Sequence, residues 1–174
     1  MKTLLIYLFC IMPALVLAQN TKPDDRGYIV KVGDKAPDDF KLVLANGETT
    51  SLSKLKGKVV VLQFTASWCV VCRDEMPHLE KDVWQAYKDK GLMLIGVDRD
   101  EPLNVVQKFA KDMKITYPLA LDPGADIFGR FADKKSGVTR NIVIDQQGKI
   151  AYLTRLYDEK EFKGMVAAIE KLLR

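Results

Sequence analysis

The chain has 174 residues, of which 48% are hydrophobic and 29% charged, and its formal net charge is +4. This length fits one globular domain. The 27 basic and 23 acidic residues are interspersed, without a basic run or a basic patch interleaved with aromatic residues. This distribution excludes the usual pattern of a nucleic-acid-binding protein.

The first 18 residues predict a secretory signal peptide. Lys2 supplies a positive charge, residues 4–18 are almost wholly apolar, and Ala18 gives the small residue that precedes a signal-peptidase cut. An uncleaved membrane anchor is the alternative, but the apolar run is short for a span of about 20 residues and Pro13 interrupts it. We therefore expect a periplasmic or cell-envelope protein, cleaved after Ala18, that has lost Cys10 with the signal peptide.

After the signal peptide, we expect a polar tether or loosely packed strand at residues 19–32 and one folded domain at residues 33–174. Near the start of this domain, Asn-Gly at residues 46–47 separates two alternating runs, which predicts a β-hairpin. The apolar run at residues 59–62 then predicts a buried strand.

A Cys-x-x-Cys pair, Cys69 and Cys72, follows this strand. Met76, Leu79 and Val83 have the spacing of one helical face, so the pair lies where a strand gives way to a helix. The free N–H groups and the positive dipole end of a helix start stabilise a thiolate, which is the form of cysteine that attacks a disulfide. We predict that Cys69 is the nucleophile and that Cys72, one turn further on, resolves the mixed disulfide.

Other interpretations of the cysteine pair stay open at this point. The pair could be a plain buried disulfide, two inert core thiols, or half of a zinc site. Zinc normally takes four ligands, however, and a second cysteine pair is missing, so we expect no metal and no other cofactor. A lone pair in an exported chain fits an electron-passing circuit better than a disulfide scaffold, and the strand–helix context favours the redox interpretation.

Strands and helices alternate in the remaining sequence. The expected elements are a strand at 92–97, a helix opened by Pro102, a short helix at 125–131, strands at 141–144 and 150–154, and a last helix that starts at Asp158. This alternation predicts an α/β fold with a central mixed β-sheet flanked by helices on both faces, preceded by the N-terminal hairpin.

The string Trp-Cys-x-x-Cys-Arg-x-Glu-x-Pro at residues 68–77 resembles the exported TlpA/ResA-like thiol–disulfide oxidoreductases of the thioredoxin superfamily. Gly-Asp-x-Ala-Pro at 33–37 and Leu-Lys-Gly-Lys at 55–58 are similar to other landmarks of that family, so the resemblance covers about residues 33–174. It implies a thioredoxin-like three-layer sandwich. It also implies an enzyme that exchanges or reduces disulfides of exported proteins, with a membrane electron donor.

Two neighbours of the dithiol are further candidates. Glu75 lies three positions after Cys72 on the same helix side, and the resemblance implies a role in the proton transfers of the cysteines. A solvated helix glutamate is an equal alternative. Thioredoxin has a buried aspartate where this chain has Gln63, which cannot titrate, so Glu75 or water would have to serve. Trp68 is expected to shield the site and to offer a flat docking surface.

The loop before the strand at 141–144 departs from the family pattern. Family members carry Pro-Thr-Thr there, with the proline in cis facing the dithiol, and Thr139 takes the place of that proline. Because a cis bond before a non-proline residue costs about 3 kcal/mol, we predict a trans peptide between Val138 and Thr139. In the family, backbone groups beside the proline pair with bound polypeptide. We therefore expect Val138 and Thr139 to border an altered substrate groove.

Two rival functions remain. A peroxiredoxin-like thiol peroxidase also lacks the cis-proline and has an arginine nearby, as Arg140 is here. Its Pro-x-x-x-Thr-x-x-Cys box, however, requires proline at position 62 and threonine at position 66, where this chain has Leu62 and Ala66. A non-catalytic metal-binding or scaffold module is the other rival, since copper carriers of related fold use two cysteines and a loop histidine. His78 follows on the helix instead and, at 100° per residue, points away from both cysteines.

Overall fold

The structure of the protein, a computed structural model, describes residues 26–174. The predicted signal peptide and its cleavage point, and residues 19–25 of the predicted tether, lie outside the described residues. None of the helices in residues 26–174 combines the length and the apolar character that crossing a membrane requires.

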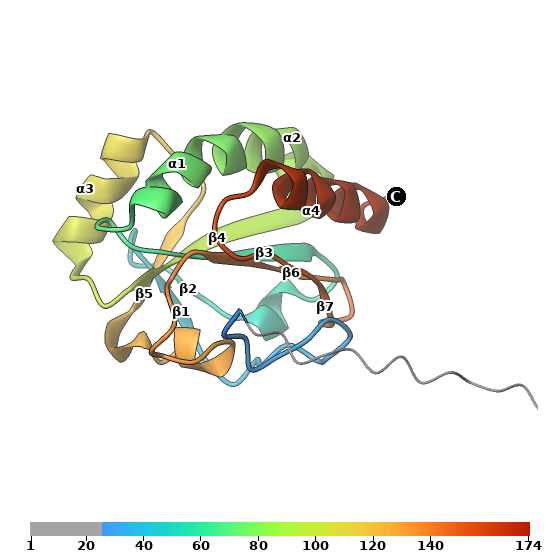
Figure 1. Cartoon of the computed structure of the whole chain (residues 1–174), viewed down its shortest axis with the longest axis horizontal. Helices are drawn as coiled ribbons and strands as arrows, with labels where there is room; N and C mark the ends of the chain where they lie inside the picture. Colours follow the sequence, from blue (N-terminus) through green and yellow to red (C-terminus); the bar gives the residue numbers. More distant parts are fainter. Residues whose placement is uncertain (1–25) are drawn as a thin grey trace, which may run out of the picture.

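Seven strands form one mixed sheet in the order β2-β1-β5-β4-β3-β6-β7 (Figure 1). The strands are β1 Leu42–Leu44, β2 Thr49–Thr50, β3 Val59–Thr65, β4 Leu92–Arg99, β5 Leu119–Asp122, β6 Arg140–Ile144 and β7 Ile150–Leu153. Strand β3 pairs in parallel with β4 and antiparallel with β6, and every one of its residues is buried. The central strand is thus the predicted apolar run, and β1 and β2 are the predicted hairpin.

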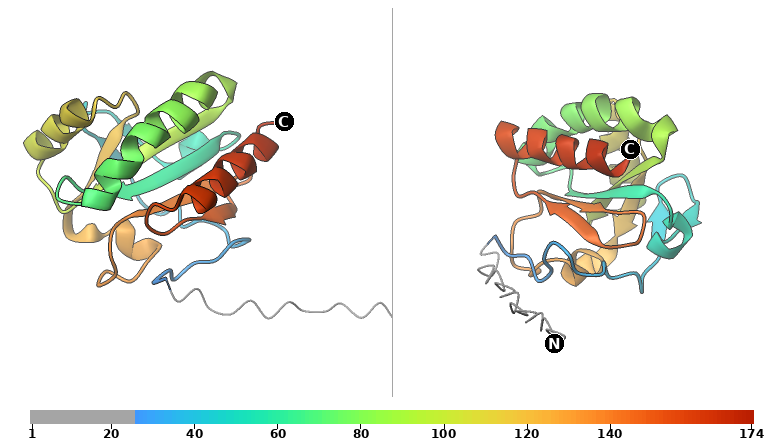
Figure 2. Two further views of the ribbon diagram at one scale, coloured as in Figure 1. Left: turned by 45° about the horizontal axis from the view of Figure 1, so that its top comes forward. Right: turned by 90° about the vertical axis from the view of Figure 1, so that its right-hand side faces the viewer.

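The α-helices all cover one face of the sheet, as Figure 2 also shows. They are α1 Val70–His78, α2 Gln85–Tyr87, α3 Leu103–Met113 and α4 Glu159–Leu172, with a π-helical segment η2 at Leu79–Trp84 and a 3₁₀ turn η3 at Lys88–Lys90. Their inward side chains, such as Met76, Phe109 and Met165, pack together above the sheet. The π segment follows Pro77, whose missing N–H breaks the regular helical hydrogen bonding.

The opposite face of the sheet is covered by 3₁₀ turns rather than long helices. These turns are η1 Leu52–Leu55, η4 Pro123–Ala125 and η5 Phe128–Arg130. The ring of Phe64 on β3 contacts the rings of Phe128 and Phe131 at centroid distances of 5.3 and 5.6 Å. The predicted three-layer sandwich is therefore present, and its lower layer consists of turns.

Residues 26–32, which we expected to belong to a tether or a loosely packed strand, include residues that contact the domain. Tyr28 is 8% exposed, its hydroxyl donates a hydrogen bond to the carbonyl of Thr154, and the N–H of Ile29 donates to the carbonyl of Phe131 at 3.0 Å. Arg26 pairs with Glu161 of α4. Contacts with the domain thus begin before the expected boundary at residue 33, and the buried ring of Tyr28 and the partly buried Val30 pack against the core.

Candidate active site

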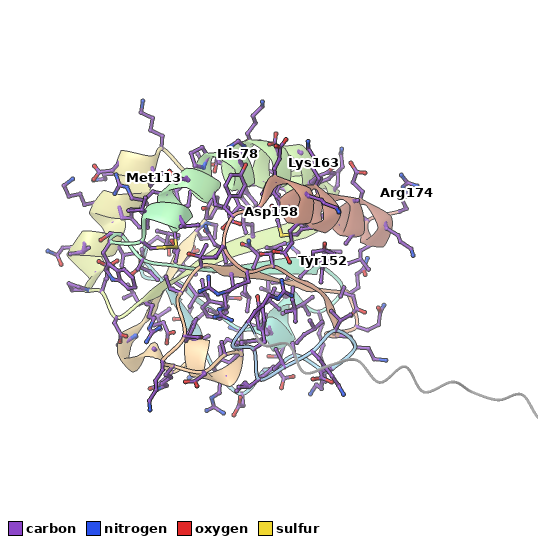
Figure 3. The ribbon with its side chains drawn as sticks, viewed as in Figure 1. His78, Met113, Tyr152, Asp158, Lys163 and Arg174 are labelled. Atoms are coloured by element: carbon purple, nitrogen blue, oxygen red, sulfur yellow. A yellow bond between two sulfur atoms is a disulfide. The ribbon has the colours of Figure 1, made fainter. Side chains whose placement is uncertain are left out.

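The two cysteines lie at the junction of β3 and α1. Cys69 is the N-cap residue of α1, and its Sγ accepts a hydrogen bond from the N–H of Cys72 at 3.2 Å. The two residues form a disulfide, which is visible as a yellow bond at the start of α1 in Figure 3. Cys69 is 8% exposed and Cys72 is fully buried. A nucleophile at Cys69 would therefore be reachable and would lie at the positive end of the helix.

The surface beside Cys69 is apolar. Trp68 is 62% exposed and Val70 is similarly exposed, so a large ring and a branched aliphatic side chain flank the reachable cysteine. Exposed large apolar side chains next to a reactive group are typical of a surface that another molecule covers. The exposed ring of Trp68 is compatible with the docking role that we predicted for it, which stays a prediction.

Thr139 lies directly against the disulfide. Its hydroxyl oxygen is 3.1 Å from Sγ of Cys69 and 3.2 Å from Sγ of Cys72. The described residues contain no cis peptide bond, so the predicted trans bond between Val138 and Thr139 is present. The side chain of Val138 is buried in the lower core, which leaves its backbone as the part that could border a substrate groove.

Glu75 is buried in the helix-covered core, at 1% exposure. Its Oε1 accepts a hydrogen bond of 2.7 Å from Nδ2 of Asn141, while its Oε2 has no hydrogen-bond partner among residues 26–174. Burial raises the pKa of Glu75 to about 7, and the hydrogen bond from Asn141 opposes part of that rise. The interpretation of Glu75 as a solvated helix glutamate is therefore wrong.

Comparison with known proteins agrees with this geometry. Residues 32–153 match the model of the AhpC/TSA family. The chain belongs to the AhpC/TSA family. Thiol-disulfide oxidoreductase ResA of Bacillus cereus is 33% identical over 121 residues, which are 70% of this chain and 68% of ResA.

Solved structures of proteins described as thiol–disulfide enzymes are also similar to this chain. A candidate protein disulfide isomerase from Bacteroides thetaiotaomicron is 57% identical, with a TM-score of 0.82 over 84% of this chain and 92% of that chain. The thioredoxin domain of a thiol-disulfide oxidoreductase from Bacteroides vulgatus is 27% identical, with a TM-score of 0.69 over 83% and 99% of the two chains. This AhpC/TSA family member is thus a thiol–disulfide oxidoreductase with a thioredoxin-like fold, as predicted.

Sequence reasoning named Gln63 but missed the other buried polar side chains on this side of the sheet, Asn141, Thr154 and Tyr117. Nδ2 of Asn141 also donates to Oγ1 of Thr154 at 2.9 Å, and on the same side of the sheet the hydroxyl of Tyr117 donates to Oε1 of Gln63 at 2.8 Å. All four side chains are buried. Strand alternation could have indicated Asn141, because it shares a sheet face with the buried Val143.

Glu101 is another residue that the sequence did not reveal. Its carboxylate accepts hydrogen bonds from the N–H of Ser67 at 2.6 Å and from the hydroxyl of Ser67 at 2.5 Å. These bonds fix the loop two residues before Cys69. The neighbouring Asp98 is buried, and burial raises its pKa to about 8, with a further contribution from the Glu101 carboxylate.

The two residues on which the rival functions depend have other contacts. The ring of His78 stacks on Tyr157 of the loop before α4, with ring centroids 5.1 Å apart. The guanidinium of Arg140 lies over the rings of Tyr28 and Phe128, at 4.6 and 5.3 Å, and donates to the carbonyl of Gly137 at 2.9 Å. Aromatic rings of the fold thus contact both side chains.

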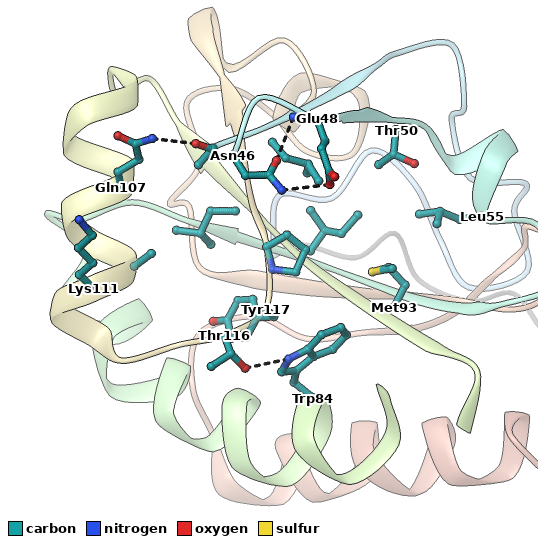
Figure 4. A pocket seen from close by; sticks show the side chains of 16 residues that line it. Asn46, Glu48, Thr50, Leu55, Trp84, Met93, Gln107, Lys111, Thr116 and Tyr117 are labelled. Carbon is teal, nitrogen blue, oxygen red and sulfur yellow. Dashed lines mark hydrogen bonds between the residues drawn. The ribbon is translucent and has the colours of Figure 1, made fainter. Parts of the chain in front are cut away.

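A cavity of about 790 Å³ lies apart from the dithiol (Figure 4). Trp84, Met93 and Tyr117 line it together with the tip of the β1–β2 hairpin. Nε1 of Trp84 donates to Oγ1 of Thr116 at 3.0 Å across its rim. Neither cysteine is among its lining residues, so this cavity is separate from the dithiol.

Proposed function

We propose that Cys69 attacks the disulfides of partner proteins and that Cys72 resolves the resulting mixed disulfides. The observation that carries this proposal is the difference between the two sulfurs. Cys69 is reachable and sits at a helix start with an N–H aimed at its sulfur, whereas Cys72 is fully buried one turn further on. Thiolate stability and access both favour Cys69 as the attacking group.

The reaction conserves atoms and electrons. The Cys69 thiolate attacks one substrate sulfur, the substrate disulfide breaks, and the released substrate thiolate takes up a proton. The Cys72 thiolate then attacks Sγ of Cys69, and the second substrate thiolate leaves. Two electrons have passed to the substrate and the protein disulfide remains, so a reductant of the thiol class must restore the dithiol.

We assign the deprotonation of Cys72 to Glu75. The carboxyl lies one helical turn beyond Cys72, and its pKa of about 7 gives it an appreciable proton affinity at neutral pH. No hydrogen bond joins Glu75 to either sulfur among the described residues, so the proton would travel through a water molecule. Gln63, which replaces an acid in thioredoxin, is already bonded to Tyr117 and cannot take that proton.

The substrates that we propose are exported proteins with accessible disulfides or dithiols. Trp68 and Val70 would contact them, and the backbone at Val138 and Thr139 would border the groove. The proposal of export depends on residues 1–18, which are outside the described part of the chain. A periplasmic or cell-envelope protein of this kind needs a membrane electron donor to keep its dithiol reduced.

Serine variants test the assignment of roles. Cys72→Ser should trap a covalent complex between Cys69 and a model protein disulfide, because the resolving thiol is missing. Cys69→Ser should form no such complex. Non-reducing electrophoresis and mass spectrometry of each variant, mixed with a disulfide-bearing substrate, measure the outcome. Trapping by Cys69→Ser, with none by Cys72→Ser, would reverse the roles.

A further inference from the structure

The hydroxyl of Thr139 contacts both sulfurs of the active site. It lies 3.1 Å from Sγ of Cys69 and 3.2 Å from Sγ of Cys72; Thr139 and Cys72 are buried, and Cys69 is 8% exposed. The resemblance discussed above puts a proline at this position, and proline carries no hydroxyl. The contact therefore gives this chain a polar group at its dithiol that the family pattern lacks.

The position of this hydroxyl is fixed by its surroundings. The carbonyl of Thr139 accepts hydrogen bonds from the N–H of Leu156 at 3.2 Å and from the guanidinium of Arg155 at 3.1 Å. The next residue, Arg140, begins β6 and is in register with Phe64 on β3. A threonine side chain is also stiff at its first torsion. Little reorganisation is needed to keep the hydroxyl at the sulfurs.

Once the disulfide is reduced, the two sulfurs can form different hydrogen bonds with this hydroxyl. A Cys69 thiolate can only accept, and the structure already aims one donor at it, the N–H of Cys72 at 3.2 Å. Cys72 is buried within the helix and has a thiol hydrogen to donate. A hydroxyl can donate and accept at the same time. Thr139 can therefore accept from the thiol of Cys72 while it donates to the thiolate of Cys69.

We propose that Thr139 is a catalytic residue whose hydroxyl donates a hydrogen bond to the Cys69 thiolate in the reduced protein. The bond makes Cys69 reactive at lower pH and shifts the dithiol–disulfide equilibrium toward the dithiol. The proposal rests on the role of Cys69 as nucleophile in the proposed function. The sequence predicted only that Thr139 borders the substrate groove. The proposal adds a role for its hydroxyl at the sulfur of Cys69.

The variant Thr139→Val tests the hydroxyl, because valine keeps the shape of threonine and removes the donor. A hydrogen bond to a charged group is worth enough for about a tenfold effect. Alkylation of Cys69 by iodoacetamide at pH 6 should be about tenfold slower, and its pH profile should move to higher pH. Peptide mass spectrometry assigns the alkylated cysteine.

Equilibration with glutathione gives a second readout. Two glutathione molecules supply one electron each to reduce the protein disulfide, and they become one glutathione disulfide. Thr139→Val should shift this equilibrium about tenfold toward the protein disulfide, which corresponds to a potential lower by about 30 mV. Thr139→Ser, which keeps a hydroxyl, should stay within about twofold of the wild type in both measurements.

Thr65→Val is the matched control. Thr65 is also buried, and its hydroxyl contacts Sδ of Met76 at 3.7 Å rather than a cysteine, so neither measurement should change. Urea unfolding of each variant checks that it is folded. If folded Thr139→Val matches the wild type in both readouts, or if Thr139→Ser behaves like Thr139→Val, the proposal is overturned. A wild-type Cys69 that resists alkylation would instead contradict the nucleophile assignment.

Discussion

At the scale of single residues, the burial of Glu75 decides which chemistry it can perform. A solvated glutamate is ionised at neutral pH and is a weak base. Burial raises the pKa of Glu75 to about 7, so that the carboxyl can take up or release a proton near neutral pH. Asn141 occupies Oε1, so in the proposed mechanism Oε2, which has no hydrogen-bond partner among the described residues, is the oxygen that would take up the proton.

Glu75→Gln should therefore slow the second step of the reaction and not the first. We expect decay of the mixed disulfide to be at least about tenfold slower at pH 8, because the base for Cys72 is missing, and its inflection near pH 7 should disappear. Formation of the mixed disulfide by Cys69 should stay within about twofold. Rapid-quench measurements between pH 5.5 and 9 separate the two steps.

Asp74→Asn is the matched control for this experiment. Asp74 precedes Glu75 on α1, but its side chain is exposed, so the variant should keep the wild-type rates and pH profile. A Glu75→Gln protein whose mixed disulfide decays with the wild-type pH profile would remove Glu75 from the mechanism.

At the scale of elements, the start of α4 supports the loop that carries Thr139. Asp158 is the N-cap of α4 and accepts the N–H of Glu161 at 2.8 Å. The carboxylate of Glu161 accepts the N–H of Arg155 at 3.0 Å, and the guanidinium of Arg155 donates to the carbonyl of Thr139 at 3.1 Å. One chain of hydrogen bonds thus runs from a helix cap to the dithiol loop.

Removal of this cap should destabilise the fold. We expect Asp158→Ala to lower the free energy of unfolding by about 1 kcal/mol, the usual effect of losing an N-cap side chain. The comparison is Glu159→Ala, one position further on, whose ion pair with Lys163 is exposed and should contribute much less. Urea unfolding of the oxidised proteins measures both. Equal losses for the two variants would show that the cap has no special role.

At the scale of the whole molecule, the sequence predicted the features of the fold that depend on local sequence patterns. The apolar run of β3, the apolar stripe along α1 and η2, and the hairpin turn could be predicted because period and turn chemistry are local properties. The position of the cysteine pair followed from these elements. Contacts between distant segments could not be predicted in the same way. The bond between Glu75 and Asn141 joins residues 66 positions apart, and the contacts of Tyr28 and Thr139 depend on packing across the sheet.

Two of the buried carboxyl groups, Glu75 and Asp98, also make the stability of the whole molecule depend on pH. Burial raises the pKa of Glu75 from 4.5 to about 7 and that of Asp98 from 3.8 to about 8. Between the unfolded and folded values, the folded protein keeps protons that the unfolded chain releases. The stability due to these groups is therefore complete below about pH 4 and is lost as the pH rises toward 7 for Glu75 and 8 for Asp98.

Glu75→Gln isolates the part of this dependence that belongs to one residue. Glutamine resembles the protonated acid and can still accept the hydrogen bond from Asn141, so the variant and the wild type should be about equally stable at pH 4.5. At pH 8.5 the wild type has to ionise a buried carboxyl, and the variant does not. The shift in pKa corresponds to an advantage for the variant on the order of 3 kcal/mol. Urea unfolding of both oxidised proteins at pH 4.5, 6.5 and 8.5 measures the difference, which should grow with pH. A difference that is constant over this range, or a variant that is less stable at pH 8.5, would mean that the pKa of Glu75 is not raised in the folded protein.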